Sequence, residues 1–164
     1  MRPLDDIDRR IIALLQADAR QSNRALAEAV GIAPSTCHER VRELNRRGVI
    51  TGYHAAVDLG ALNRNIEAIV SVRLRPKTRP VLDEFLAQVW ALEETMEVYL
   101  LSGSDDIIVH LSVADTTALR SLVLDEITAI PGVVDETTSL VFSHTRKPVL
   151  GFLAEPPGRI RPDS

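Results

Sequence analysis

The sequence predicts an α+β protein with a helical amino-terminal domain and a carboxy-terminal domain that mixes strands and helices. Three observations support this class. Apolar residues recur every three to four positions over residues 5–47, which is the period of a buried helix face. From residue 66 the period changes to two, as in a half-buried strand. The later segments then follow the order β-α-β-β-α-β, which is typical of a ferredoxin-like layout.

The first two helices are predicted over residues 5–18 and 23–30. In the first, apolar residues form one stripe, and the acidic residues of the first turn complement the positive end of the helix dipole. These apolar residues are Ile7, Ile11, Leu14 and Leu15. In the second, Ser22 is a suitable N-cap and Gly31 can adopt the left-handed conformation that ends a helix.

The third helix is predicted to begin at Pro34, a favoured first-turn residue, and to end at Gly48. Its inner face carries Cys37, Val41 and Leu44. Residues 49–58 are β-prone, and they predict a small two-stranded wing with a turn near Thr51 and Gly52.

The carboxy-terminal domain is predicted to place both helices on one face of an antiparallel sheet. Its expected elements are a strand from Ile66 to about Pro76, a helix over 79–92, a hairpin formed by 96–103 and 106–114, a helix capped by Asp115 or Thr116 and stopped at 131–132, and a strand over 133–145. The other face carries Ile69 and Ile108 mixed with Ser71 and His110. Because this face is too apolar for open solvent, we expect self-association.

These segments divide the chain into a winged helix-turn-helix domain over 1–58, a linker over 59–65, a sheet domain over 66–147 and a tail over 148–164. The net charge of −4 is uneven, because residues 1–54 carry about +2 and residues 55–164 about −6. Although the protein is acidic overall, its first domain can therefore present a local basic face.

Several functional classes are disfavoured by composition. No apolar run reaches the roughly 18 residues that span a bilayer, and the amino terminus lacks a signal peptide, so we expect a cytoplasmic location without membrane contact. Cys37 is the single cysteine and cannot form an internal disulfide. The four histidines have no close metal-ligand spacing, and no glycine-rich phosphate loop occurs. We therefore expect no enzyme activity, no metal and no cofactor.

The third helix concentrates arginine on a short segment. Three helices with a tight turn between the last two, followed by a wing, describe a domain whose last helix enters the major groove of double-stranded DNA. The residues expected to contact DNA are Ser35, Thr36, His38, Glu39, Arg40, Arg42 and Arg46. The alternative is that these arginines form a solvated face paired with Glu39 and Glu43.

Residues 4–53 resemble the start of the leucine-responsive regulatory protein/AsnC family of transcription regulators, and the similarity covers nearly the whole chain. The motifs that carry this resemblance are L-D-x-x-D at 4–8, L-A-x-x-V-G at 26–31, C-x-E-R-V-R-x-L at 37–44 and G-V-I-x-G-Y at 48–53. The second domain is similar to the family's amino-acid-binding module through L-x-G-x-x-D at 101–106 and "IPGV" at 130–133.

The resemblance implies a DNA-binding regulator that forms homodimers, often octamers, and senses a small effector, commonly an amino acid. The implied effector site lies between dimers. It contains Leu101, Ser102, Gly103, Ser104, Asp106, Thr138 and Ser139. Asp106 would receive an ammonium group, and the neighbouring Asp105 would repel an acidic side chain. Two alternatives stay open: an amino-acid-binding module that acts on a protein partner without DNA, and a DNA-architectural regulator without an effector.

Overall fold

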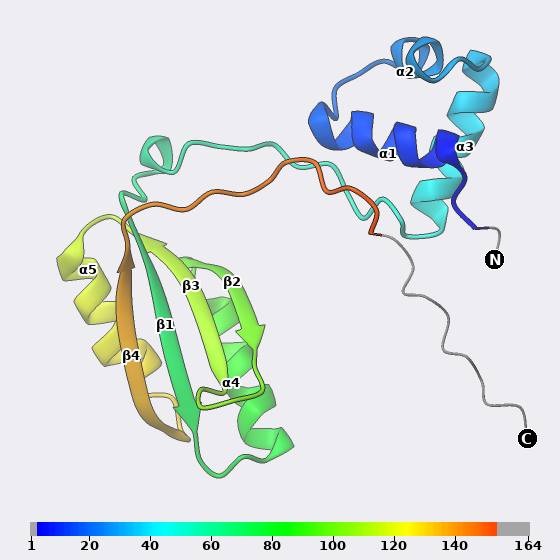
Figure 1. Cartoon of the computed structure of the whole chain (residues 1–164). Coiled ribbons are helices and arrows are strands. Elements are labelled where there is room, and N and C mark those ends of the chain that lie inside the picture. The colour runs from blue at the N-terminus through cyan, green and yellow to red at the C-terminus, as the bar shows by residue number, and fades with distance from the viewer. Residues whose placement is uncertain (1–2, 154–164) are drawn as a thin grey trace, which may run out of the picture. The chain divides into compact units, whose positions relative to one another are not determined.

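The structure is a computed structural model that describes residues 3–153. The chain forms two compact units. Among the described residues, the amino-terminal unit contains 3–55 and 145–153, and the sheet unit runs from Ala56 to His144. The described residues of the first unit contain three helices, and those of the second contain a four-stranded sheet. Figure 1 shows the helices of the second unit on one side of its sheet.

The amino-terminal unit contains the predicted helices α1 (Asp6–Ala17), α2 (Asn23–Val30) and α3 (Pro34–Arg46). The Ser22 side chain caps α2 by accepting a hydrogen bond from the Ala25 N–H, and Gly31 ends it at φ 75°. A left-handed residue at this position lets the chain turn sharply into α3. The three helices enclose a small core of Ile11, Leu26, Ala27, Val30, Cys37 and Leu44.

The two strands predicted for the wing over residues 49–58 are not formed in the single chain. Residues 51–57 form neither helix nor strand. Tight hairpin turns need positive φ values, and Gly52 is not among the residues with positive φ. A two-stranded hairpin without further packing is also marginal in water. In the segment predicted as a linker, Gly60–Leu62 form a short 3-10 helix.

The sheet unit has the predicted βαββαβ order, and its strands are β1 (Ile66–Leu74), β2 (Thr95–Leu100), β3 (Ile107–Val113) and β4 (Val133–Val141). The sheet order is β2-β3-β1-β4, and every neighbouring pair is antiparallel. Helices α4 (Arg79–Ala91) and α5 (Thr116–Ser121) cover one face (Figure 1). The predicted ferredoxin-like layout is therefore confirmed.

The core of this unit lies between the sheet and these helices. On β1 the predicted alternation is confirmed, because Ala68, Val70 and Val72 are fully buried against the helices. The last predicted helix differs, since after Ser121 it continues as a π-helix over Leu122–Ile127. The Thr128 N–H donates to the backbone carbonyl oxygen of Val123, five residues earlier, which is the hydrogen bond typical of a π-helix.

The opposite face of the sheet carries the predicted mixture of apolar and polar residues. Ile69 pairs with His110 across the β1–β3 ladder, and Ser71 pairs with Ile108. All four side chains are half-buried in the single chain. The Glu67 carboxylate on this face lies 3.1 Å from His110 Nε2 and 3.3 Å from His144 Nδ1. Across residues 3–153, no helix has the length and apolar character needed to cross a membrane.

Candidate functional site

The exposed face of α3 collects most of the residues predicted to contact DNA. Because Cys37 and Leu44 point into the core, the helix turns its remaining positions outward. The exposed predicted residues are Ser35, Thr36, His38, Glu39, Arg42 and Arg46. A helix presented in this way offers both its first turn and its basic side chains to one ligand surface.

The first turn of α3 is positioned from α2 and lacks a side-chain cap. The Asn23 amide donates to the Pro34 carbonyl oxygen at 2.7 Å, which ties the start of α3 to the start of α2. The N-cap residue is Ala33, which makes no capping hydrogen bond. The backbone N–H groups of Ser35 and Thr36 have no partner within the helix, so they are available to an anion such as a phosphate.

Arg40 lies apart from this exposed group. It is half-buried, and its NH1 lies 2.8 Å from Asp5 Oδ2 and 2.8 Å from Asp8 Oδ1. The hydrogen bonds from Arg40 to Asp5 and then to Asp8 raise the pKa of its guanidinium. The same carboxylates cap α1, because Asp5 accepts from the Asp8 N–H and Asp8 accepts from the Asp5 N–H. The geometry therefore makes Arg40 a clamp between α1 and α3.

The exposed arginines of α3 differ in how they are engaged. Arg46 donates two hydrogen bonds of 2.7 Å to Glu43, three residues before it, although its side chain is 72% exposed. Hydrogen bonding to Glu43 raises the pKa of Arg46. Within residues 3–153, Arg42 has no hydrogen-bond or ion-pair partner, so binding a phosphate would cost it no existing contact.

The second candidate site is built around the turn that joins β2 to β3. The Leu101 N–H donates to the backbone carbonyl oxygen of Asp106 at 2.8 Å and closes this turn. Ser102, Gly103 and Ser104 are exposed at its tip, whereas the Asp106 side chain is only 13% exposed. The turn therefore directs Asp106 toward the body of the sheet unit and leaves the three tip residues in solvent.

The Asp106 carboxylate meets three donors from the last residue of β1 and the segment that follows it. Lys77 Nζ lies 2.6 Å away, the Leu74 N–H donates at 2.9 Å, and Arg75 NH1 lies 3.4 Å away. Burial by itself would raise the pKa of Asp106. The hydrogen bonds from Lys77 and Leu74 and the two positive charges outweigh burial, so the pKa is lowered.

This lowered pKa predicts acid sensitivity. A carboxyl whose pKa is lower in the folded protein than in the unfolded chain stabilises the fold above its unfolded pKa, and this stabilisation is lost as the pH falls further. We expect the free energy of unfolding of the wild type to fall more steeply below about pH 4 than that of Asp106→Asn. Urea denaturation between pH 6 and pH 3 measures this difference. Parallel curves for the two proteins would contradict the assignment.

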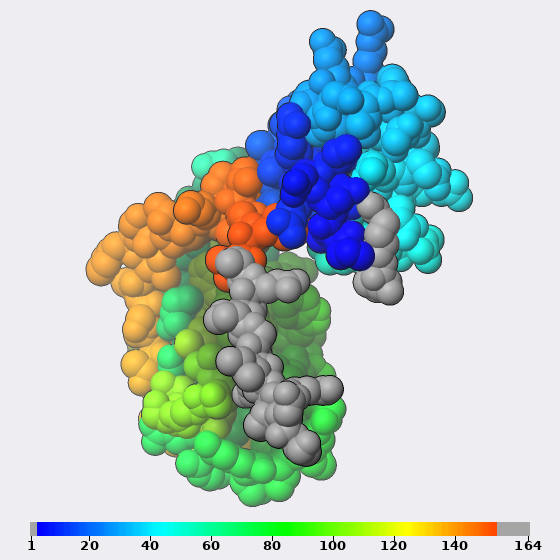
Figure 2. All heavy atoms as spheres, turned by 45° about the vertical axis from the view of Figure 1, so that its right-hand side comes forward, coloured from blue at the N-terminus to red at the C-terminus, as the bar shows by residue number. Residues whose placement is uncertain are grey.

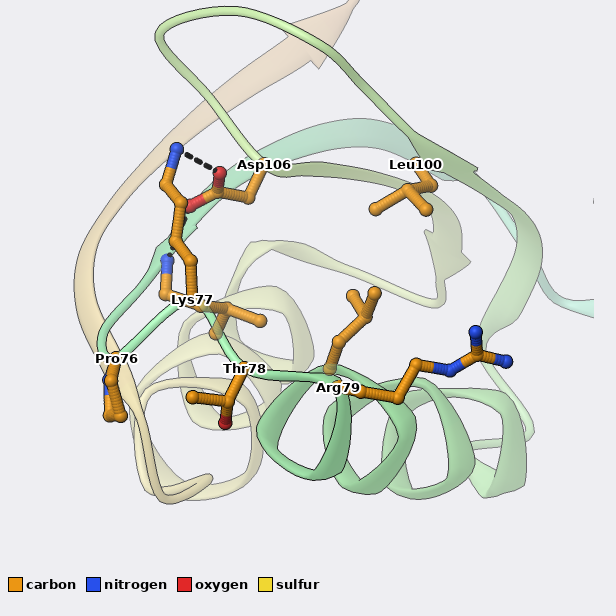
Figure 3. A pocket seen from close by; sticks show the side chains of 8 residues that line it. Pro76, Lys77, Thr78, Arg79, Leu100 and Asp106 are labelled. Carbon is orange, nitrogen blue, oxygen red and sulfur yellow. Dashed lines mark hydrogen bonds and ion pairs between the residues drawn. The ribbon is translucent and has the colours of Figure 1, made fainter.

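A cavity of about 300 Å³ opens beside this carboxylate. Figure 3 shows Lys77 joined to Asp106 at one side, Leu100 across the cavity, and Thr78 and Arg79 at the start of α4. Its lining is Leu74, Pro76, Lys77, Thr78, Arg79, Leu82, Leu100 and Asp106. Apart from Asp106, sequence reasoning missed these residues. The cationic run "RPKTRP" between a strand and a helix was the available signal.

The structure does not bring Thr138 and Ser139 together with each other. On β4, Thr138 pairs with Val70 and therefore shares the helix-covered face, whereas Ser139 pairs with Ile69 on the opposite face. Adjacent strand residues necessarily point to opposite faces. Thr138 lines a small cavity beside α5 rather than the one beside Asp106.

The structure also bears on the cysteine and on metal binding. Cys37 is fully buried, and burial raises the pKa of its thiol, which makes it an unreactive core residue. Among residues 3–153, no group of three or more His, Cys, Asp or Glu is arranged to hold a metal ion.

Known proteins resemble both units. Residues 4–51 match a family model described as winged helix-turn-helix DNA-binding, and residues 67–148 match one described as Lrp/AsnC ligand binding domain. A relative named HTH-type transcriptional regulator AldR, from Mycolicibacterium smegmatis, is 46% identical over 88% of this chain and 85% of its own length. The leucine-responsive regulatory protein of Salmonella typhimurium is 37% identical over 89% of each chain. A solved structure of a Neisseria meningitidis transcriptional regulator in complex with L-Met has a TM-score of 0.83 and 28% identity, and the match covers 88% of this chain and 94% of that one.

Proposed function

Because the chain belongs to the Lrp/AsnC family of transcriptional regulators, we propose that α3 reads DNA and that the cavity beside Asp106 binds an amino-acid effector. The exposed face of α3 is the observation that carries the first part. It combines an uncapped helix start at Ser35 and Thr36 with an unengaged Arg42 one to two turns later. Phosphates bind such N–H groups and arginines, and neighbouring side chains can reach base edges.

Removing the two exposed arginines tests DNA reading. We expect Arg42→Ala to weaken binding to the chain's own promoter DNA and to reduce the logarithmic salt slope by about 0.9, because one phosphate contact is lost. Arg46→Ala should have a smaller effect, since Arg46 must first leave Glu43. Fluorescence anisotropy at several salt concentrations measures both slopes.

The matched control is Arg120→Ala, which removes the same charge from exposed α5 in the sheet unit. It should leave the slope unchanged. A slope that stays constant in Arg42→Ala, or that falls equally in Arg120→Ala, would reject α3 as the DNA-reading surface.

The cavity beside Asp106 has the groups that a free amino acid requires. The Asp106 carboxylate can accept hydrogen bonds from an ammonium group, and Lys77 and Arg79 can pair with a carboxylate. Thr78 is the N-cap of the thirteen-residue helix α4 and makes no capping hydrogen bond, so the positive end of this helix is also free for a carboxylate. Leu74, Leu82 and Leu100 supply an apolar wall. This combination favours an amino acid with an apolar side chain.

The open face of the sheet supports assembly as a homodimer or a larger oligomer such as an octamer. Ile69 and Ile108 lie beside polar Ser71 and His110, and all are half-buried before any partner is added. A second copy related by a two-fold axis would cover them. The proposed regulator acts in the cytoplasm, where promoter DNA is accessible. Neither a metal nor an organic cofactor enters this mechanism.

A further inference from the structure

The chain after β4 returns to the amino-terminal unit and contacts α1. The Leu150 N–H donates to Gln16 Oε1 at 2.8 Å, and Gln16 Nε2 donates to the Leu150 carbonyl oxygen at 3.2 Å. The Arg9 guanidinium lies 5.2 Å from the centre of the Phe152 ring. Figure 2 shows the orange segment beside the blue residues of α1. We refer to residues 149–152 as the C-terminal strap.

The three contacts share one side of α1. Arg9 and Gln16 are seven residues apart, or about two helical turns, so they lie above one another roughly 10 Å apart. Two residues of extended chain, from Leu150 to Phe152, span about 7 Å, and the long side chains of Arg9 and Gln16 cover the remainder. The strap therefore runs antiparallel to α1.

This side of α1 differs from the two that hold the amino-terminal unit together. Ile11 points into the core, and Asp5 and Asp8 hold Arg40 of α3. The strap leaves the exposed residues of α3 uncovered, since its hydrogen bonds and ring contact are with α1. It is consequently a support of the DNA-reading unit and does not block it.

We infer that the side of α1 bearing Arg9 and Gln16 is a docking surface for the chain's own C-terminal strap. The Gln16 amide satisfies both backbone groups of Leu150, as a neighbouring strand would, and the Phe152 ring offers its face to the Arg9 cation. Docking adds a second connection between the amino-terminal unit and the sheet unit, beside residues 56–65. The DNA-reading unit therefore moves over a smaller volume than one connection would allow.

This restriction has a consequence that rests on the proposed dimeric, DNA-reading function. When two DNA-reading units of one assembly bind two half-sites, the second binding step depends on the effective concentration set by their tethers. A docked strap shortens each tether. Release of the strap lengthens each tether and lowers this effective concentration, so it should weaken binding to a two-half-site DNA severalfold without affecting a single half-site.

Hydrogen exchange on the full chain tests docking without DNA. We expect Gln16→Ala to speed exchange of the Leu150 amide severalfold, because its acceptor is removed. Alanine favours helix, so α1 stays folded. The control Leu153→Ala removes a 93% exposed side chain from the residue after the strap and should change nothing. Equally fast exchange of Leu150 in the wild type and in Gln16→Ala would overturn the inference.

A crosslink identifies the occupant. A variant that carries Gln16→Cys, Leu150→Cys and Cys37→Ser is treated with a short bismaleimide, which can join the two new cysteines. The products are then separated by size under denaturing conditions. A looped single chain supports docking of the chain's own strap, whereas covalent dimers assign the strap to a second copy and overturn the inference.

If the wild type binds no DNA at all, the proposed function fails while the exchange result still stands. If it binds DNA and Gln16→Ala binds both DNAs as the wild type does, the tethering consequence fails.

Discussion

Replacing Arg40 with alanine is expected to lower the free energy of unfolding of the amino-terminal unit by about 2–3 kcal/mol. The Asp8 side chain is completely buried and would lose its 2.8 Å ion pair with Arg40. Removing one partner of a fully buried ion pair typically costs about 3–5 kcal/mol, and we expect less because Arg40 is 23% and Asp5 39% exposed. Thermal unfolding should show a decrease in Tm of roughly 10–20 °C for a domain of this size.

The matched control is Arg46→Ala on the same helix. Arg46 also pairs with a carboxylate, but it is largely exposed, so its removal should leave the free energy of unfolding nearly unchanged. A double-mutant cycle of Arg40→Ala with Asp8→Ala should give a coupling energy of about 1 kcal/mol or more. If Arg40→Ala destabilised the protein no more than Arg46→Ala, the clamp between α1 and α3 would be contradicted.

Replacing Asp106 with asparagine is expected to abolish the stabilisation of the protein by its amino-acid effector. Asparagine keeps the shape and can still accept the hydrogen bond from the Leu74 N–H, but it lacks the charge that attracts an ammonium group. A ligand at 100 times its Kd stabilises the folded wild type by about 2.7 kcal/mol. A thermal-shift screen of the twenty amino acids, followed by the best one on the variant, measures the loss.

Asp105→Asn is the control for this experiment, because it removes the same charge one residue earlier. Asp105 lies 3.9 Å from Arg73 and does not line the cavity. It should leave the shift produced by an apolar amino acid intact, and DNA binding without effector should persist in both variants. A full shift in Asp106→Asn would reject Asp106 as a ligand-binding residue, and a wild type that responds to no amino acid would reject the effector class.

Most helices and strands follow from features that are close together in the sequence. The Ser22 cap, the Gly31 stop and the period-two pattern of β1 each act over a few residues, so they can be recognised in the sequence. The winged helix-turn-helix class is confirmed, but the two strands expected in the wing are not formed in the single chain, for a related reason. A β-prone composition predicts strands, but pairing also needs a turn geometry that Gly52 does not adopt and a surface on which the strands pack.

The exposed residues of α3 were predictable because helical periodicity separates an inner face from an outer one. The same periodicity could not separate Arg40 from Arg42. Both lie outside the central apolar stripe, and only Arg40 meets two carboxylates. In the second site, the turn before Asp106 was predictable from the sequence. The positions of the Lys77 cation and of the apolar Leu82 side chain in the lining of the cavity were not.

The order of elements, the buried faces and the basic surface of α3 are thus written in local patterns of residue type, because a helix or a strand repeats its environment every few residues. The partners of the charged groups depend on packing. Asp8 lies 32 residues before Arg40, and the backbone N–H that binds Asp106 belongs to Leu74, also 32 residues away. Such contacts exist only when helices cross or strands pair, so the clamp and the Asp106 cavity became visible only in the folded chain.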